Sequence, residues 1–141
     1  MITLSKPVHF FLTLSKAQSV LSRRLDACLG GIGFNEFVIL YHLSQAKEEK
    51  MRRTDLADKV GLTASGVTRL LVPMEKIGLV KRESNEHDAR VSLVVLAAGG
   101  MRLLEEAIEN IESRSRDLVP SSLEKDIPKV SEFLMSLGVV R

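Results

Sequence analysis

The chain has 141 residues, enough for one domain with a hydrophobic core and too few for two domains of ordinary size. Hydrophobic residues make up 45% of it, and no apolar run approaches the roughly 18 residues that a membrane span needs. The single cysteine cannot form an internal disulfide, so nothing requires an oxidising compartment. We expect one cytoplasmic domain over residues 1–141 with no membrane partner.

The net charge of +2 conceals an uneven distribution. Residues 50–82 carry eight Lys or Arg and three Asp or Glu, whereas residues 83–141 carry seven and eleven. A basic segment in the middle of the chain suggests a local surface for a polyanion, although a merely solvated basic face would give the same counts.

Two helices are predicted in the first third of the chain. Between residues 4 and 29 apolar side chains recur on two interleaved seven-residue spacings, a stripe typical of a helix that packs on another helix: Leu4, Phe11, Leu14, Leu21, Leu25 and Cys28. Glycines at 30, 31 and 33 end this helix, and residues 36–45 continue with a second apolar-periodic segment.

Two shorter helices separated by a tight turn are predicted next. Thr54 can cap the first of them, and Gly61 stops it. Thr63 can cap the second, which runs to Gly78 and is expected to kink at Pro73. The small residues at this turn would let the two helices cross steeply, as in a helix-turn-helix.

The second helix of such a pair presents its N-terminal outer face to the major groove of DNA. That face carries short hydroxyl side chains that can reach phosphates or bases and one longer basic side chain: Thr63, Ser65, Gly66, Thr68 and Arg69. A helical hairpin with a solvated outer face would show the same pattern, so the helix pair alone leaves DNA binding open.

After Gly78 the pattern changes to β-type residues, at 79–82 and again at 91–96. The polar stretch between them, residues 83–90, is much longer than a two-residue turn. A hairpin whose tip touches DNA would explain that length.

Two further helices are predicted towards the C-terminus. Gly99 and Gly100 lead into an amphipathic segment that extends to Leu118, and we expect these glycines to leave the junction mobile. Pro120 starts a final helical segment, with a break or kink at Pro128. The chain is therefore expected to be mainly α, with a two-stranded wing.

Residues 34–100 resemble the core of the MarR family of winged helix-turn-helix regulators. The resemblance rests on the helix-turn-helix residues 54–71, on Asp88-Ala89-Arg90 in the wing, and on an "EK-G-LV" pattern: Glu75, Lys76, Gly78, Leu79 and Val80. It implies a winged helix-turn-helix at residues 34–98, flanked by dimerisation helices at residues 1–33 and 99–141.

The resemblance further implies a homodimeric transcriptional regulator that binds an inverted repeat in duplex DNA. Arg90 would enter the minor groove, and Asp88 would brace the wing through charge-assisted hydrogen bonds. The expected DNA-binding residues are Thr54, Thr63, Ser65, Gly66, Thr68, Arg69, Lys76, Arg82, Asp88 and Arg90. No phosphate loop, nucleophile elbow or zinc-helix motif stands out, so we expect no enzyme, cofactor or metal site.

The resemblance also implies a repressor whose DNA affinity responds to a small phenolic or anionic effector. The candidate pocket residues are Phe11, Phe34, Phe37 and Tyr41, although aromatic residues on helix faces are more often plain core. Ala97 stands where the family commonly has a capping threonine.

Two alternatives stay open. Cys28 could act as a redox sensor, but it lies on the apolar stripe and no second cysteine could resolve a sulfenic acid. A winged-helix module that binds another protein, without sequence-specific DNA binding, is the other alternative.

Overall fold

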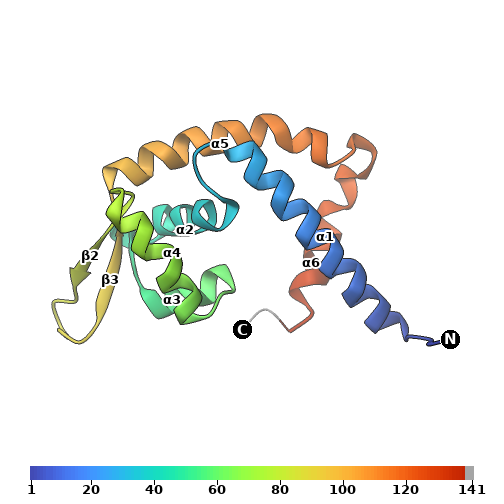
Figure 1. The fold of residues 1–141 in the computed structure, drawn as a ribbon, viewed down its shortest axis with the longest axis horizontal. Coiled ribbons are helices and arrows are strands. Elements are labelled where there is room, and N and C mark those ends of the chain that lie inside the picture. Colours follow the sequence, from blue (N-terminus) through green and yellow to red (C-terminus); the bar gives the residue numbers. More distant parts are fainter. Residues whose placement is uncertain (139–141) are drawn as a thin grey trace.

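The computed structural model describes residues 1–138, so residues 139–141 of the segment expected to dimerise lie outside the described part. The described helices and strands follow one another in this order: α1 (Lys6–Leu29), α2 (Phe34–Gln45), the 3₁₀ segment η1 (Lys47–Glu49), β1 (Lys50–Arg52), α3 (Arg53–Val60), α4 (Ala64–Lys76), β2 (Val80–Ser84), β3 (Ser92–Leu96), α5 (Ala98–Leu118), the 3₁₀ segment η2 (Ser121–Asp126) and α6 (Ile127–Met135). The prediction of a mainly α fold with a winged helix-turn-helix is confirmed (Figure 1).

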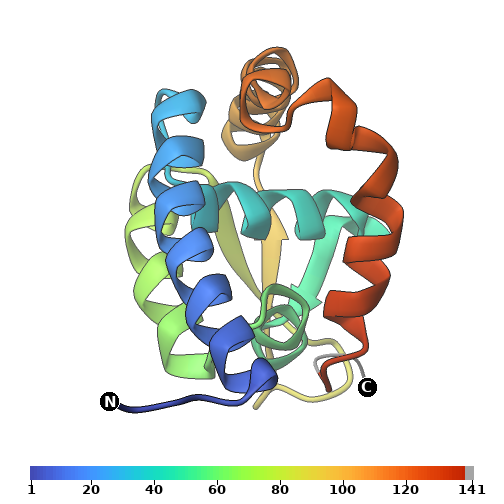
Figure 2. The ribbon, with the colours of Figure 1, turned by 90° about the vertical axis from the view of Figure 1, so that its right-hand side faces the viewer.

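The hydrophobic core lies where α2, α3, α4, α5 and the sheet meet (Figure 2). Its completely buried side chains include Leu40 of α2, Leu56 of α3 and Val67 of α4, and Leu104 of α5 is buried beside them. Burying side chains of this size stabilises each by about 1.5–3 kcal/mol relative to exposure. This core fixes the α3–α4 pair relative to the long helix α5.

The turn between α3 and α4 forms as its sequence predicts. Gly61 adopts a left-handed conformation, with φ +72°, that a residue without Cβ enters at little cost. Thr63 caps α4, because its Oγ1 accepts a hydrogen bond from the Gly66 amide over 3.0 Å. Helix α4 continues through Pro73, which lacks the N–H that the carbonyl of Arg69 would otherwise accept.

Thr54 is not the N-cap of α3, and that prediction is wrong. Helix α3 begins one residue earlier, at Arg53, and Arg52 occupies the cap position without a side-chain cap. The boundary is set by β1, which pairs antiparallel with β3 and places Arg52 opposite Leu93. The sheet therefore has three strands in the order β1-β3-β2, one more than the predicted hairpin.

Gly99 and Gly100 lie inside the first turn of α5 and serve close packing, contrary to the mobile junction that we expected. A Cβ added to Gly100 would overlap the carbonyl oxygen of Leu79, and one added to Gly99 would lie 2.9 Å from that of Gly78. The Ala97 amide also donates to the Leu79 carbonyl over 3.0 Å. As expected, Ala97 provides no side-chain cap for α5.

Helices α1 and α6 project away from this core and leave apolar side chains exposed. They approach each other where the rings of Phe10 and Phe133 meet, with centroids 5.4 Å apart. Pro128 stands in the first turn of α6, where its missing N–H removes no helical hydrogen bond. It therefore does not interrupt α6. Within residues 1–138 we find no helix with the length and apolar character of a membrane span.

Candidate nucleic-acid interface

Short hydroxyl side chains at the start of α4 are engaged with the helix itself. The Oγ1 of Thr63 accepts from the Gly66 amide and lies 3.3 Å from the Oγ of Ser65. The Oγ1 of Thr68 donates to the Ala64 carbonyl over 3.0 Å. These hydroxyls therefore order the first turns of α4 in the free protein; the cap at Thr63 was expected, and the bond of Thr68 to the helix was not.

Arg53 connects α3 to α4, and we did not foresee this contact from the sequence. Its Nη1 donates to the Oγ1 of Thr68 over 3.2 Å. Arg69, one residue further along α4, is exposed. The run Arg52-Arg53 was visible in the sequence, but only the packing of α3 on α4 brings the second arginine to the groove-facing end of the recognition helix.

Hydrogen bonds within the wing tip hold it in one conformation. The Asp88 carboxylate accepts from the Arg90 amide over 3.0 Å, and its two oxygens lie 3.1 and 3.3 Å from Nε and Nη2 of Arg90. The Oδ1 of Asn85 accepts from the amides of His87 and Asp88. The bracing contact expected of Asp88 is therefore present, and Asn85 adds a second one that we did not predict.

The electrostatics of the wing tip agree with this bracing. The side-chain hydrogen bond from Arg90 holds the pKa of Asp88 below its ordinary value, and the Arg90 backbone amide and the charge of Arg52 act in the same direction. The influence of Arg52 on Asp88 shows that the start of α3 and the wing tip are neighbours. Arg52 and Arg53 thus lie between the wing and α4.

The base of the wing is held by an ion pair between its outer strands. The Nζ of Lys50 in β1 lies 3.0 Å from the Oε1 of Glu83 in β2, across β3, and 3.6 Å from the Oε2 of Glu48. The hydrogen bond with Glu83 is the main cause that raises the pKa of Lys50. This pair links the wing to the body of the domain.

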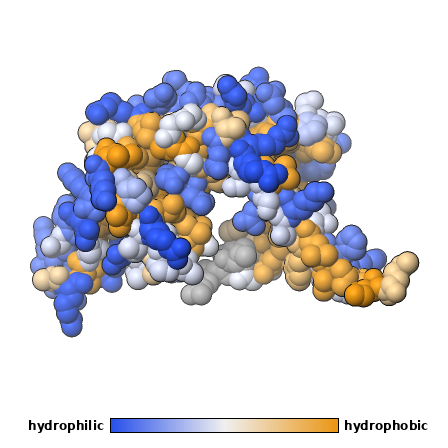
Figure 3. Space-filling model, viewed as in Figure 1, coloured by the Kyte–Doolittle hydropathy of each residue, from blue (hydrophilic) through white to orange (hydrophobic). Residues whose placement is uncertain are grey.

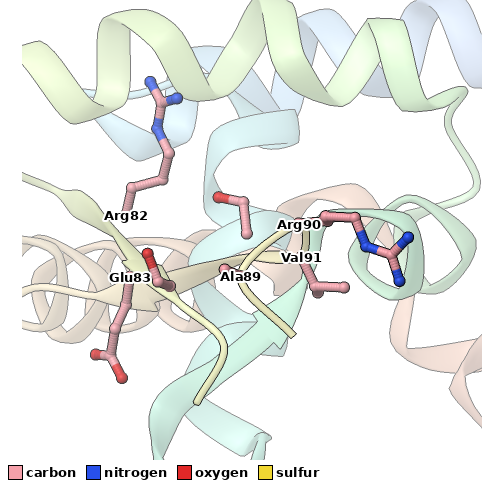
Figure 4. A pocket seen from close by; sticks show the side chains of 7 residues that line it. Arg82, Glu83, Ala89, Arg90 and Val91 are labelled. Atoms are coloured by element: carbon pink, nitrogen blue, oxygen red, sulfur yellow. The ribbon is translucent and has the colours of Figure 1, made fainter. Parts of the chain in front are cut away.

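Two of the expected DNA-binding residues lie away from the others. The Nη2 of Arg82 pairs with the Oε2 of Glu75 at 3.2 Å, and Lys76 is exposed at the last turn of α4. Twelve residues of helix, about 18 Å, separate Lys76 from the start of α4. Figure 4 shows Arg82 directed towards α4, and Arg90 directed sideways, away from Arg82.

A shallow pocket of about 150 Å³ lies on the wing, between the side chains of Arg82 and Arg90 (Figure 4). It is lined by Arg82, Glu83, Ser84, Ala89, Arg90, Val91 and Ser92. Arg82 and Arg90 therefore share the surface of the wing, whereas Lys76 stands at the C-terminal end of α4, away from Thr63, Thr68 and Arg69.

The four aromatic residues expected to line an effector pocket do not form one cluster. Phe34 and Phe37 pack together with ring centroids 5.8 Å apart, whereas Tyr41 is exposed and contacts His42. Phe11 lies about 27 Å along α1 from its C-terminal end, where α2 follows. Cys28 is half-buried in the last turn of α1. Whether these four aromatic side chains share one pocket depends on how α1 and α2 pack, which their positions in the sequence do not show.

A pocket that we did not foresee, of about 230 Å³, lies where α5 bends into η2 and α6. It is lined by Ser115, Arg116, Val119, Ser121, Glu124 and Ile127. None of the four aromatic candidates contributes to it.

Comparison with known proteins finds similarity to one family of regulators. The sequence model of the MarR family matches residues 34–92. The helix-turn-helix-type transcriptional regulator YdgJ of Bacillus subtilis is 29% identical over 113 residues, which cover 80% of this chain and 63% of YdgJ. The transcriptional repressor YetL of Bacillus subtilis is 24% identical over 139 residues, with 89% and 83% covered.

The fold also matches solved structures. Sco3205, a MarR family transcriptional regulator from Streptomyces coelicolor solved in complex with DNA, superposes with a TM-score of 0.79 at 20% identity, covering 95% of this chain and 89% of that one. The curated relatives are named as transcriptional regulators, in agreement with the prediction that the chain is not an enzyme. The family model over residues 34–92, the named relatives and the shared fold together support a winged-helix regulator of the MarR family.

Proposed function

We propose that this protein binds duplex DNA with α4 in the major groove and the wing tip in the adjacent minor groove. The observation that carries the proposal is that α4 and the braced wing tip both bear exposed arginines, Arg69 and Arg90, and that the exposed Arg53 is hydrogen-bonded to Thr68 of α4. Arginine suits this task because its guanidinium contacts both phosphates and base edges. The complex of Sco3205 with DNA, in the same fold, supports it.

The protein acts in this proposal as a homodimer, joined through residues 1–33 and 99–141, while residues 34–98 read DNA. The support is the apolar surface of α1 and α6, orange at the lower right of Figure 3. Its exposed members include Leu4, Val8, Phe11, Leu12, Leu21, Ile127, Val130 and Phe133. Apolar patches of this kind mark contact surfaces. The helical stripe read from the sequence, which includes Phe11 and Leu21, lies on this surface.

A two-fold dimer would place two copies of α4 on one side of the duplex. Recognition helices about one turn apart bind half-sites roughly 10 base pairs apart, centre to centre. The operator is then a short inverted repeat.

We further propose that the protein is a repressor whose DNA affinity is changed by a small phenolic or anionic effector. The relative YetL is named as a repressor, which supports the sign of regulation. The close contact of Gly100 with Leu79 would couple α5 to the wing, so that a shift of α5 also moves the wing. A tenfold change in DNA affinity needs only about 1.4 kcal/mol of difference in effector binding between the two conformations.

Selection of bound fragments from a random duplex library, followed by a salt titration of the enriched sequence, tests this function. We expect an inverted repeat, with the logarithm of affinity falling by about 0.9 per phosphate contact for each unit of log salt. A folded protein that enriches no sequence and responds weakly to salt would contradict DNA reading and favour a protein-interaction module. Comparing the wild type with Cys28→Ser after peroxide treatment tests the redox alternative separately.

A further inference from the structure

The hydroxyl of Thr68 makes two hydrogen bonds in the free protein. Its hydrogen is donated to the Ala64 carbonyl, one helical turn earlier, over 3.0 Å. Its oxygen accepts from the Nη1 of Arg53 over 3.2 Å. A hydroxyl has one hydrogen to donate, so a base edge could take this donor only by displacing the helical bond.

The position of Arg53 relative to Thr68 is fixed by the core. Arg53 begins α3, and the neighbouring core residues Leu56 of α3 and Val67 of α4 are completely buried in the same cluster. Arg53 therefore approaches Thr68 from a rigid neighbouring helix.

The Cβ of threonine carries only a hydroxyl and a methyl group as heavy substituents. The hydrogen of the hydroxyl is given to the helix and one of its two lone pairs accepts from Arg53, so the side chain keeps one lone pair and the methyl group for contacts with a ligand. In the major groove the matching apolar group is the C5 methyl of thymine, which protein methyl groups contact directly.

We propose that Arg53 is a positioning residue that makes Thr68 read DNA through its methyl group, so that each half-site contains a thymine whose C5 methyl packs on Thr68. This inference rests on the proposed DNA binding. In this inference the methyl of Thr68 contacts the thymine, and Arg53 holds the Thr68 side chain in the conformation that presents the methyl.

The test replaces each thymine of the enriched operator, one position per half-site at a time, by deoxyuridine, which lacks only the C5 methyl. For the wild type we expect one symmetric position at which the change lowers affinity about fourfold, the value of one buried methyl-sized group. Thr68→Ser, which keeps the hydroxyl and loses the methyl, should bind both duplexes equally. Thr68→Val, which keeps a methyl and loses the hydroxyl, should retain the preference.

The role of Arg53 is tested in both backgrounds. Arg53→Ala should reduce the thymine preference below twofold in the wild type and leave it unchanged in Thr68→Val, which has no hydroxyl to hold. Lys59→Ala, which removes a positive charge from the other end of α3, is the matched control and should leave the preference intact. Circular dichroism verifies the fold of every variant.

Three results would overturn the inference. The first is an operator without any methyl-sensitive position. The second is a preference that survives in Thr68→Ser and disappears in Thr68→Val, because the hydroxyl would then be the reading group. The third is an equal loss for Arg53→Ala on both duplexes and in both backgrounds with a lower salt slope, because Arg53 would then contact phosphate only. Failure to enrich any sequence would contradict DNA binding itself, and this inference with it.

Discussion

In the first turn of α5, Gly100 lies against the carbonyl oxygen of Leu79, the residue that precedes β2. The same oxygen accepts the Ala97 amide at 3.0 Å. A side chain at position 100 would have to displace either the helix or the strand, because the atom in its way belongs to the backbone.

We expect Gly100→Ala to destabilise the protein by about 2–3 kcal/mol, as overpacking of a rigid site does. Gly31→Ala is the matched control, since its Cβ would meet only the Cδ1 of Leu103 at 3.6 Å. Urea unfolding of both variants at one protein concentration measures the difference. Equal stability of the two variants would show that the α5 contact yields easily.

Arg90→Ala should weaken binding to the enriched operator and to a scrambled duplex by a similar factor, about 5- to 30-fold, since a groove or phosphate contact of this kind is worth about 1–2 kcal/mol. Fluorescence anisotropy across a salt series would also show a shallower slope. Arg102→Ala removes an exposed charge from α5 and serves as the control. A loss confined to the operator would mean that Arg90 reads bases.

The pKa of Asp88 should lie below its ordinary value of 3.8 and rise towards it in Arg90→Ala. Because the folded-state pKa is lowered, the stabilising effect of this pair is present above the ordinary pKa and is lost as the pH falls through the lowered one. The brace is therefore complete at neutral pH and is lost in acid. A carboxyl-detected NMR titration of both proteins measures the shift, and an unchanged pKa in the variant would contradict the contact.

Phe11→Glu should weaken dimerisation at least tenfold, because Phe11 is 53% exposed in the single chain and a carboxylate at that position could not be buried without a partner. Sedimentation equilibrium at micromolar protein measures the change. Thr13→Glu adds the same charge to an exposed polar position on the opposite face of α1 and should dimerise like the wild type. A dimeric Phe11→Glu would place the interface elsewhere.

Features that depend on a few adjacent residues could be predicted from the sequence. The glycine turn at Gly61, the cap at Thr63 and the bracing of the wing by Asp88 all involve partners within four residues. The order of the helices also followed from apolar spacing, with most ends displaced by one or two residues. The final segment differs, because it begins as the 3₁₀ segment η2 and α6 starts only at Ile127.

Features that depend on distant partners could not be predicted. Strand β1 has three residues, too few to show alternation, and exists because it pairs with β3. The contact of Arg53 with Thr68 joins residues 15 positions apart, through the packing of two helices. The pair Gly99-Gly100 resembled a flexible joint in the sequence. Only the position of Leu79 shows that Gly100 is needed because a Cβ would overlap the Leu79 carbonyl oxygen.

The hydrogen bonds of Asn85, Asp88 and Arg90 affect the rate and the entropy of association with DNA. A long polar loop normally loses conformational entropy when it enters a groove, and ordering each long side chain costs about 0.5–1.5 kcal/mol. Here the backbone of the tip is already ordered before any DNA is present. Docking of the wing should therefore be fast, with a small entropic penalty.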